Sequence, residues 1–277
     1  MSVTTRQTVE REASAVQALR RGPLYWAVAD ALVLAKRNLI QIPRNPELVV
    51  FATIQPVMFV LLFRYVFGGA INVGATSYVN YLMAGIFVQT VAFGSVTTGI
   101  GLAEDLHRGL IDRFRSLPMS RSAVLTGRTL ADLVRNLFVV LVMLAVGLLV
   151  GFRPQGSAIG WVAGFGLLLL FSFAISWIAA TIGLLVRSVE AAQSAGFIWL
   201  FPLTFASSAF VQTRTMPGWL RAFADNQPVT VIVDAVRGFL LGTDAGAHSW
   251  LAFVWCVGIL VVFVPLSVSL YRRTTTR

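Results

Sequence analysis

The sequence predicts an all-α integral membrane protein with six transmembrane helices. Of its 277 residues, 57% are hydrophobic and only 12% are charged, and the mean hydropathy is +0.77. Soluble domains carry about 25% charged residues, and a soluble core of this size could not bury so much apolar surface. A bilayer can accommodate it, because there the solvent itself is apolar. Apolar stretches near the roughly 20 residues that span the hydrocarbon set the number of helices.

Two segments precede the first apolar stretch. Residues 1–23 are polar and charged, and we expect a disordered cytoplasmic tail. In residues 24–46, apolar and aromatic residues are interrupted by Asp30, Lys36 and Arg37. This pattern favours an amphipathic helix in the membrane interface, although an ordinary solvated helix would show it too.

The transmembrane domain is predicted over residues 47–272, and residues 273–277 form a short cytoplasmic tail. A further apolar segment, Asn226–Gly242, is too short to cross a bilayer. We interpret it as a half-helix in the outer leaflet before the last span, with a plain surface helix as the alternative. The six predicted spans are 48–67, 78–102, 131–150, 159–186, 192–211 and 250–271.

The basic residues predict the orientation. With six spans, the side that holds both termini carries 17 Arg and Lys residues, and the opposite side carries 4. Cytoplasmic segments are enriched in such residues, so both termini are predicted to be cytoplasmic. The same count explains the formal net charge of +10 by topology, which removes the reason to expect nucleic-acid binding.

Catalytic and metal-binding motifs are missing. No G-x-x-x-x-G-K-[ST] phosphate loop occurs, and His107 and His248 fall on opposite sides of the membrane, where they cannot share a metal. Gln55 and Gln89 are the main polar side chains of the spans, and we expect no acidic residue at membrane depth. The chain is therefore predicted to be no enzyme, to bind no cofactor or metal, and to take its energy from a partner.

A short amphipathic helix is predicted in the loop between the second and third spans. Leu110, Ile111, Phe114 and Leu117 share one helical face, and Pro118 ends the segment. Such a helix can rest on lipid, or it can insert into a groove of a cytoplasmic protein. Periodicity alone does not choose between these alternatives.

Within the predicted half-helix, Asp234 and Arg237 stand three positions apart. This spacing brings two side chains together on one helical face, so we expect an ion pair. Pairing would lower the cost of placing both charges in the membrane.

Three stretches resemble the permease subunits of ABC-2 type transporters, in the branch of the daunorubicin-resistance membrane proteins. They are residues 55–70 of the first span, residues 108–121 around the amphipathic loop helix, and residues 227–238 before the last span. Gln227 stands where the family often has Asn. The likeness covers nearly the whole chain beyond residue 30.

The resemblance implies a bacterial cytoplasmic-membrane exporter. Two permease subunits, identical or paralogous, would pair in the lipid above two ABC ATPase subunits, which would bind ATP and Mg. The cargo would be an amphiphilic drug, polyketide or lipid. A polysaccharide or glycolipid exporter is the alternative, and a non-transporting membrane anchor or signalling component is an alternative of another class.

The resemblance also implies roles for particular residues. The segment that couples to the ATPase would comprise Glu104, Asp105, Arg108, Leu110, Ile111, Phe114, Arg115, Leu117 and Pro118. An outer gate would comprise Pro228, Asp234 and Arg237. The conduit between the subunits would be lined by Gln55, Phe59, Phe63 and Gln89.

Overall fold

The computed structural model describes residues 23–41, 46–71, 73, 76–108, 121–243 and 246–274. Throughout these ranges the chain forms helices joined by turns, with no strand. Four helices are long and apolar enough to cross a membrane, and a shorter apolar helix covers Thr53–Phe67. The long ones are α4 (Tyr78–His107), α6 (Arg121–Val150), α7 (Ala158–Leu185) and α11 (Gly246–Thr274).

Shorter helices complete the bundle. α2 (Pro23–Gln41) and α3 (Pro46–Leu61) come first, and a π-helical turn, η1 (Leu62–Phe67), extends α3. The remaining helices are α8 (Val189–Phe205), the 3-10 turn η2 (Thr213–Thr215), α9 (Gly218–Asn226) and α10 (Pro228–Leu241).

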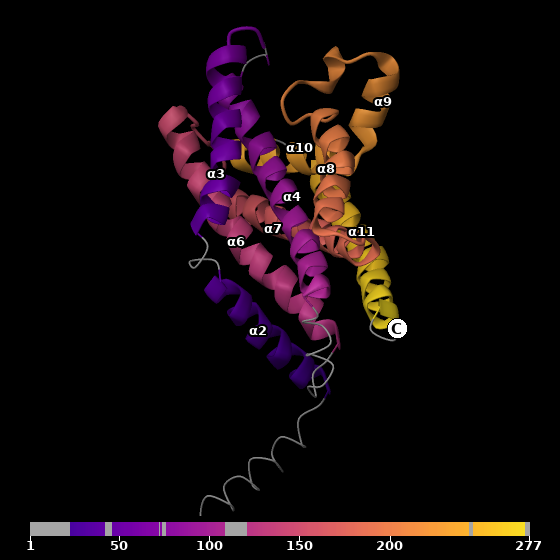
Figure 1. Ribbon diagram of the computed structural model, residues 1–277. Helices are drawn as coiled ribbons and strands as arrows, with labels where there is room; N and C mark the ends of the chain where they lie inside the picture. The colour runs from indigo at the N-terminus through magenta and orange to yellow at the C-terminus, as the bar shows by residue number, and fades with distance from the viewer. Residues whose placement is uncertain are drawn as a thin grey trace, which may run out of the picture.

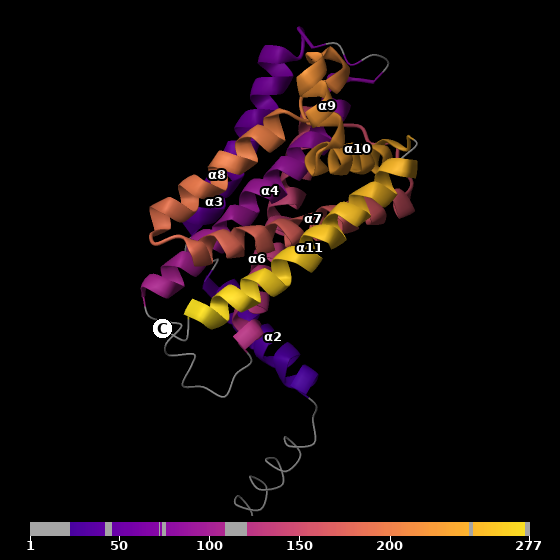
Figure 2. The same cartoon turned by 90° about the vertical axis from the view of Figure 1, so that its right-hand side faces the viewer.

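The bundle has two distinct ends (Figures 1 and 2). α2 lies beneath the long helices at the end where α11 finishes, and we call this the α2 end. α9 and α10 lie at the opposite end, with α10 running across the long helices, and we call this the α10 end.

α4 is the central helix, packed against α3, α6, α7, α8 and α10. Within the bundle, 78% of its most apolar stretch is buried, against 17% for that of α11 and 28% for that of α6. α11 and α6 therefore present their apolar surface outward, as expected of helices that face lipid. Exposed Trp250, Phe253, Val261 and Phe138 belong to those surfaces.

α4 and α7 approach closely because glycines face each other. A Cβ atom on Gly99 would overlap the backbone of Ala179, and one on Gly183 would overlap the backbone of Gly99. Small residues at such crossings let membrane helices gain dispersion contacts between their backbones. These glycines fix α7 against the helix that carries most of the candidate site.

Side-chain caps explain where several helices begin. The hydroxyls of Ser77, Ser157 and Ser188 accept hydrogen bonds from the backbone N–H groups at the starts of α4, α7 and α8. α10 begins with the Gln227 side chain capping Val229 N–H and ends at Gly242, whose φ of +70° suits glycine.

The helix bounds correct three expectations. α8 ends at Phe205, where the predicted fifth span continued to residue 211, and a non-helical turn covers 206–212. α9 precedes the predicted half-helix and was not expected. α6 begins at Arg121, ten residues before the predicted third span, so Arg121 and Arg128 lie in its first three turns.

Candidate functional site

A cavity of about 500 Å³ lies beside α4, between α3 and α6 on one side and α8 on the other. This volume is in the range of small-molecule sites. α4 contributes residues from Gln89 to Glu104, so the cavity extends from the middle of the bundle toward the α2 end. Its lining residues are Gln55, Pro56, Phe59, Gln89, Thr90, Phe93, Gly94, Val96, Thr97, Ile100, Gly101, Glu104, Arg128, Arg135, Asn136, Val139, Gln193 and Phe197.

The lining separates into zones of different chemistry. Phe59, Phe93 and Phe197 supply aromatic rings, and Glu104 and Arg128 supply charge toward the α2 end. Side-chain amides lie between these extremes. Rings beside a few polar groups suit a ligand with an apolar body and polar substituents.

Three of the four predicted conduit residues, Gln55, Phe59 and Gln89, line this cavity. Phe63 does not line it; its ring stacks on those of Phe59 and Phe210, nearer the α10 end. Their role as a conduit stays a prediction.

Two ion pairs stand at the charged end of the cavity. Arg128 of α6 contacts the Asp105 carboxylate of α4 at 2.5 Å, and Arg135 contacts Asp132 within α6 at 2.9 Å. The expectation that no acidic residue lies within the spans is wrong, because Asp132 falls inside the predicted third span and is 8% exposed. Arg128, which precedes the predicted third span, is also a helical residue of α6.

The Asp132–Arg135 pair also joins α6 to α4. The Thr98 hydroxyl donates a short hydrogen bond to Asp132, and the Arg135 guanidinium donates to the Gly94 carbonyl at 2.8 Å. Each charge therefore has a partner besides the other, which is the condition for tolerating a buried pair. Gly94 also makes room, since a Cβ there would overlap the Asn136 side chain.

Asn136, which directly follows Arg135 on α6, connects three helices. Its amide donates to the hydroxyl of Ser172 on α7 at 2.8 Å and to that of Ser95 on α4 at 3.4 Å. Ser95 also donates to the Val91 carbonyl of its own helix at 2.7 Å. Buried hydroxyls and amides that satisfy one another fix how helices pack.

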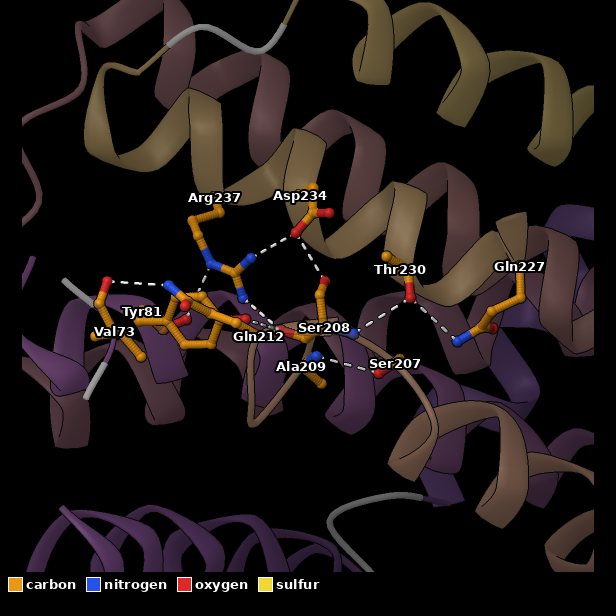
Figure 3. A network of polar contacts seen from close by, with 10 residues as sticks. All are labelled: Val73, Tyr81, Ser207, Ser208, Ala209, Gln212, Gln227, Thr230, Asp234 and Arg237. Atoms are coloured by element: carbon orange, nitrogen blue, oxygen red, sulfur yellow. Dashed lines mark hydrogen bonds and ion pairs between the residues drawn. The ribbon is translucent and has the colours of Figure 1, made fainter. Parts of the chain in front are cut away.

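A second polar cluster holds the non-helical turn 206–212 that follows α8 (Figure 3). The Ser208 hydroxyl donates to the Asp234 carboxylate at 2.7 Å, and Ser208 N–H donates to Thr230 at 3.2 Å. The Gln227 amide donates to the carbonyls of Leu203 at 2.7 Å and Ala206 at 3.2 Å. α10 thus binds the end of α8 and the turn after it.

Arg237 is the centre of this cluster (Figure 3). It pairs with Asp234 at 2.5 Å and donates to the carbonyls of Ser208 at 2.8 Å and Tyr81 at 3.2 Å. Its guanidinium also lies 3.7 Å from the centre of the Tyr81 ring, a cation–π contact. The predicted ion pair between Asp234 and Arg237 is confirmed.

α4 completes the support of the turn. The Tyr78 and Tyr81 hydroxyls donate to the carbonyls of Phe210 and Ser208, at 3.1 and 2.8 Å. Gly85 lies directly against the turn, and a Cβ there would overlap the backbone of Ala209. Among the predicted gate residues, Pro228 begins α10 while Asp234 and Arg237 hold the turn; whether they form a gate stays a prediction.

The predicted coupling segment is described only in part. Glu104 pairs with Arg108 at 2.6 Å, and Asp105 pairs with Arg128. Both carboxylates lie in the last turn of α4, at the α2 end. The other predicted coupling residues lie outside the described residues: Leu110, Ile111, Phe114, Arg115, Leu117 and Pro118.

Sequence reasoning missed Arg128, Asp132, Arg135 and Asn136 as parts of the site. A signal was present, since Asp132 and Arg135 have the same three-residue spacing as Asp234 and Arg237. The partners on α4, Thr98 and the Gly94 carbonyl, carry no sequence pattern of their own.

Comparison with known proteins identifies the family. Residues 30–241 match the ABC-2 type transporter family. A daunorubicin-resistance ABC transporter permease protein of Streptomyces coeruleorubidus is 36% identical over 250 residues, 89% of this chain and 87% of the relative. A probable doxorubicin-resistance ABC transporter permease protein of Mycobacterium tuberculosis is 28% identical over the full length of both chains. A putative transport permease of Cyanophora paradoxa is 25% identical over 77% of this chain and 74% of its own.

A match of this extent includes the cavity, α10 and the turn between α8 and η2. In this family the membrane-spanning component and the ATPase are separate subunits. The chain therefore belongs to the ABC-2 type transporter family, as a transmembrane component without an ATPase of its own.

Proposed function

We propose that this chain is the permease subunit of an ATP-driven exporter of amphiphilic, ring-containing compounds, and that the cavity beside α4 receives them. Six spans would cross a bacterial cytoplasmic membrane: α3 with η1, α4, α6, α7, α8 and α11. α2 would lie in the cytoplasmic interface, where both termini would also be found. The proposed orientation follows from the excess of basic residues toward the α2 end.

The lining of the cavity is the observation that carries this proposal. Phe93 and Phe197 stand with ring centroids 5.5 Å apart, and Gln89 and Gln193 face the same space. The Thr90 hydroxyl and Arg128 Nε make no hydrogen bond within the described ranges. The names of two relatives point to daunorubicin and doxorubicin, which are planar aromatic compounds with polar substituents.

Energy would enter at the α2 end. Two ATPase subunits, binding ATP and Mg, would dock on the loop between α4 and α6 and move it. Asp105 and Arg128 tie the last turn of α4 to the start of α6 at 2.5 Å, so a push on the loop would reach both helices together. Both helices line the cavity, so this pair would transmit the movement from the ATPase to the cargo.

A second permease would complete the passage, as an identical copy or a paralogue. Mycobacterium tuberculosis has two doxorubicin-resistance permease proteins that match this chain, at 28% and 25% identity. Asp234 and Arg237 would act at the outer gate by holding the turn 206–212 in place, and Pro228 would act there by beginning the helix that carries them.

The experiment measures ATP-dependent accumulation of doxorubicin in inside-out membrane vesicles that contain the chain and the ATPase that co-purifies with it. Phe93→Ala removes a cavity ring, and Phe253→Ala removes an outward-facing ring on α11 as the matched control. We expect Phe93→Ala to weaken doxorubicin binding, and with it accumulation at sub-saturating doxorubicin, about ten-fold, as for an interaction of about 1.4 kcal/mol, while Phe253→Ala matches the unmodified chain. Transport of an oligosaccharide but not of doxorubicin would refute the proposed cargo.

A further inference from the structure

Beyond the cavity, toward the α10 end, α3 with η1 meets α8 and the turn after it through stacked phenylalanine rings. The ring centroids of Phe63 and Phe210 are 4.5 Å apart, those of Phe201 and Phe205 are 4.8 Å apart, and those of Phe205 and Phe210 are 5.2 Å apart. We call this cluster the phenylalanine seam. Its members are Phe59, Phe63, Phe67, Phe201, Phe205 and Phe210.

The seam is continuous with the cavity. Phe59 lines the cavity and lies 6.0 Å from Phe63 and 6.1 Å from Phe205. Phe93, another lining residue, lies 5.7 Å from Phe201. At its other end the seam passes from Phe63 to Phe67, 5.3 Å away and 41% exposed. A series of neighbouring phenylalanine rings therefore connects the cavity with the surface near the α10 end.

Both helices of the seam have an interrupted backbone. η1 is a π-helical turn that carries Phe63 and Phe67, and Pro56 lies about two helical turns before it inside α3. Pro202 lies inside α8, between Phe201 and Phe205, and has no N–H to donate. π-Helical turns and internal prolines are places where a helix bends at low cost.

One side of the seam is held in place. Phe210 is 4% exposed, and its carbonyl accepts the Tyr78 hydroxyl at 3.1 Å. The turn that carries it is bound by Asp234 and Arg237 through Ser208. Phe63, by contrast, lies on the π-helical turn η1, none of whose residues is buried. Separation of the seam is therefore expected between Phe63 and Phe210.

We propose that the phenylalanine seam is the closed outward passage of the cavity and that it admits planar aromatic cargo. The inference rests on the proposed function and adds the route and its selectivity. Opening the seam without a ligand loses several ring contacts. A flat aromatic ligand that enters between Phe63 and Phe210 replaces the face-to-face contacts that it breaks, whereas a hydrated sugar chain replaces none of them.

The test joins the two sides of the seam by a covalent cross-link. Phe63→Cys and Phe210→Cys are combined in a Cys256→Ser background, which removes the chain's own cysteine, and the pair is joined by a short bifunctional thiol reagent with a cleavable disulfide. The matched control combines Phe87→Cys and Phe165→Cys, whose ring centroids are 6.4 Å apart between α4 and α7, outside the seam.

Joining the seam pair is expected to lower ATP-dependent doxorubicin accumulation in inside-out vesicles at least ten-fold, and reductant is expected to restore it. Doxorubicin binding to the purified complex should change less than two-fold, because the cavity is untouched. The joined control pair should transport like its reduced form. Unchanged transport after complete joining of the seam pair would overturn the proposal.

A second variant keeps the test decisive if the cysteine pair does not fold. Phe210→Leu keeps an apolar side chain but removes the ring, and Phe253→Leu on α11 is its control. We expect Phe210→Leu to lower doxorubicin transport at least five-fold with binding intact, and transport equal to the control would overturn the proposal. If the unmodified chain binds and transports no doxorubicin, the proposed function fails; if it does both and the seam variants match it, only the seam fails.

Discussion

The buried pair of Asp132 and Arg135 gives the sharpest prediction about stability. Their side chains are 11% and 15% exposed, and the contacting atoms are 2.9 Å apart. At an effective dielectric constant of 20, two unit charges at that separation attract by about 6 kcal/mol. Desolvation offsets much of this attraction, but removal of one partner leaves the other charge buried and alone, which costs about 3–5 kcal/mol.

We therefore expect Asp132→Asn to be strongly destabilising, because Arg135 then keeps only the Gly94 carbonyl. Arg135→Gln leaves the Asp132 carboxylate with Thr98 alone and is expected to cost a similar amount. The double variant places two neutral amides together and should recover at least about 2 kcal/mol of the summed losses, as interacting pairs do.

The assay is thermal unfolding of the purified chain in detergent, analysed as a double-mutant cycle. Arg221 and Asp225 are the matched control, since they form an ion pair at 3.3 Å with side chains 54% and 42% exposed. Exposed pairs contribute about 0–1 kcal/mol, so Asp225→Asn should barely shift the transition. Additive losses for Asp132→Asn and Arg135→Gln, with no recovery in the double variant, would refute the reasoning.

Three further predictions concern the other parts of the molecule. Gly85→Ala places a methyl group against the Ala209 backbone and should destabilise the chain by about 1–3 kcal/mol in the same unfolding assay, whereas Gly166→Ala, where a Cβ meets open space, should not. Leu110→Asp or Phe114→Asp should abolish transport and uncouple the ATPase while membrane insertion, measured by fractionation, stays normal; normal export would rule out the docking role. The purified chain alone should hydrolyse no ATP, and robust hydrolysis by a preparation free of partner would contradict the subunit assignment.

Much of the architecture is readable from hydropathy. The stretches predicted for α4 and α7 agree with the helices within a few residues at most ends, because an apolar run that ends in polar residues is a one-dimensional signal. α8 departs from this rule. Its predicted span extends to residue 211, but residues 206–212 are not helical and form hydrogen bonds with α10. Hydropathy does not report such hydrogen bonds.

The site was only half predictable for a related reason. The spacing of Asp234 and Arg237 predicted their ion pair, and Gln55 and Gln89 were identifiable as amides within apolar spans. Arg128 precedes the predicted third span, and the pairing of Asp132 with Arg135 is not predicted, because charge alone argues against a membrane helix. These charged side chains are stabilised within α6 by partners on α4. Contacts between segments that are far apart in the sequence cannot be predicted from hydropathy or spacing.

The central claim is that this chain moves an aromatic amphiphile through the cavity beside α4 with energy from a separate ATPase. Its most direct test is doxorubicin uptake by proteoliposomes that contain the purified chain together with the ATPase that co-purifies with it, compared with each component alone. The account predicts ATP-dependent uptake only when both are present, reduced about ten-fold by Phe93→Ala at sub-saturating doxorubicin. Uptake by the chain without the ATPase, or uptake unaffected by Phe93→Ala, would contradict it.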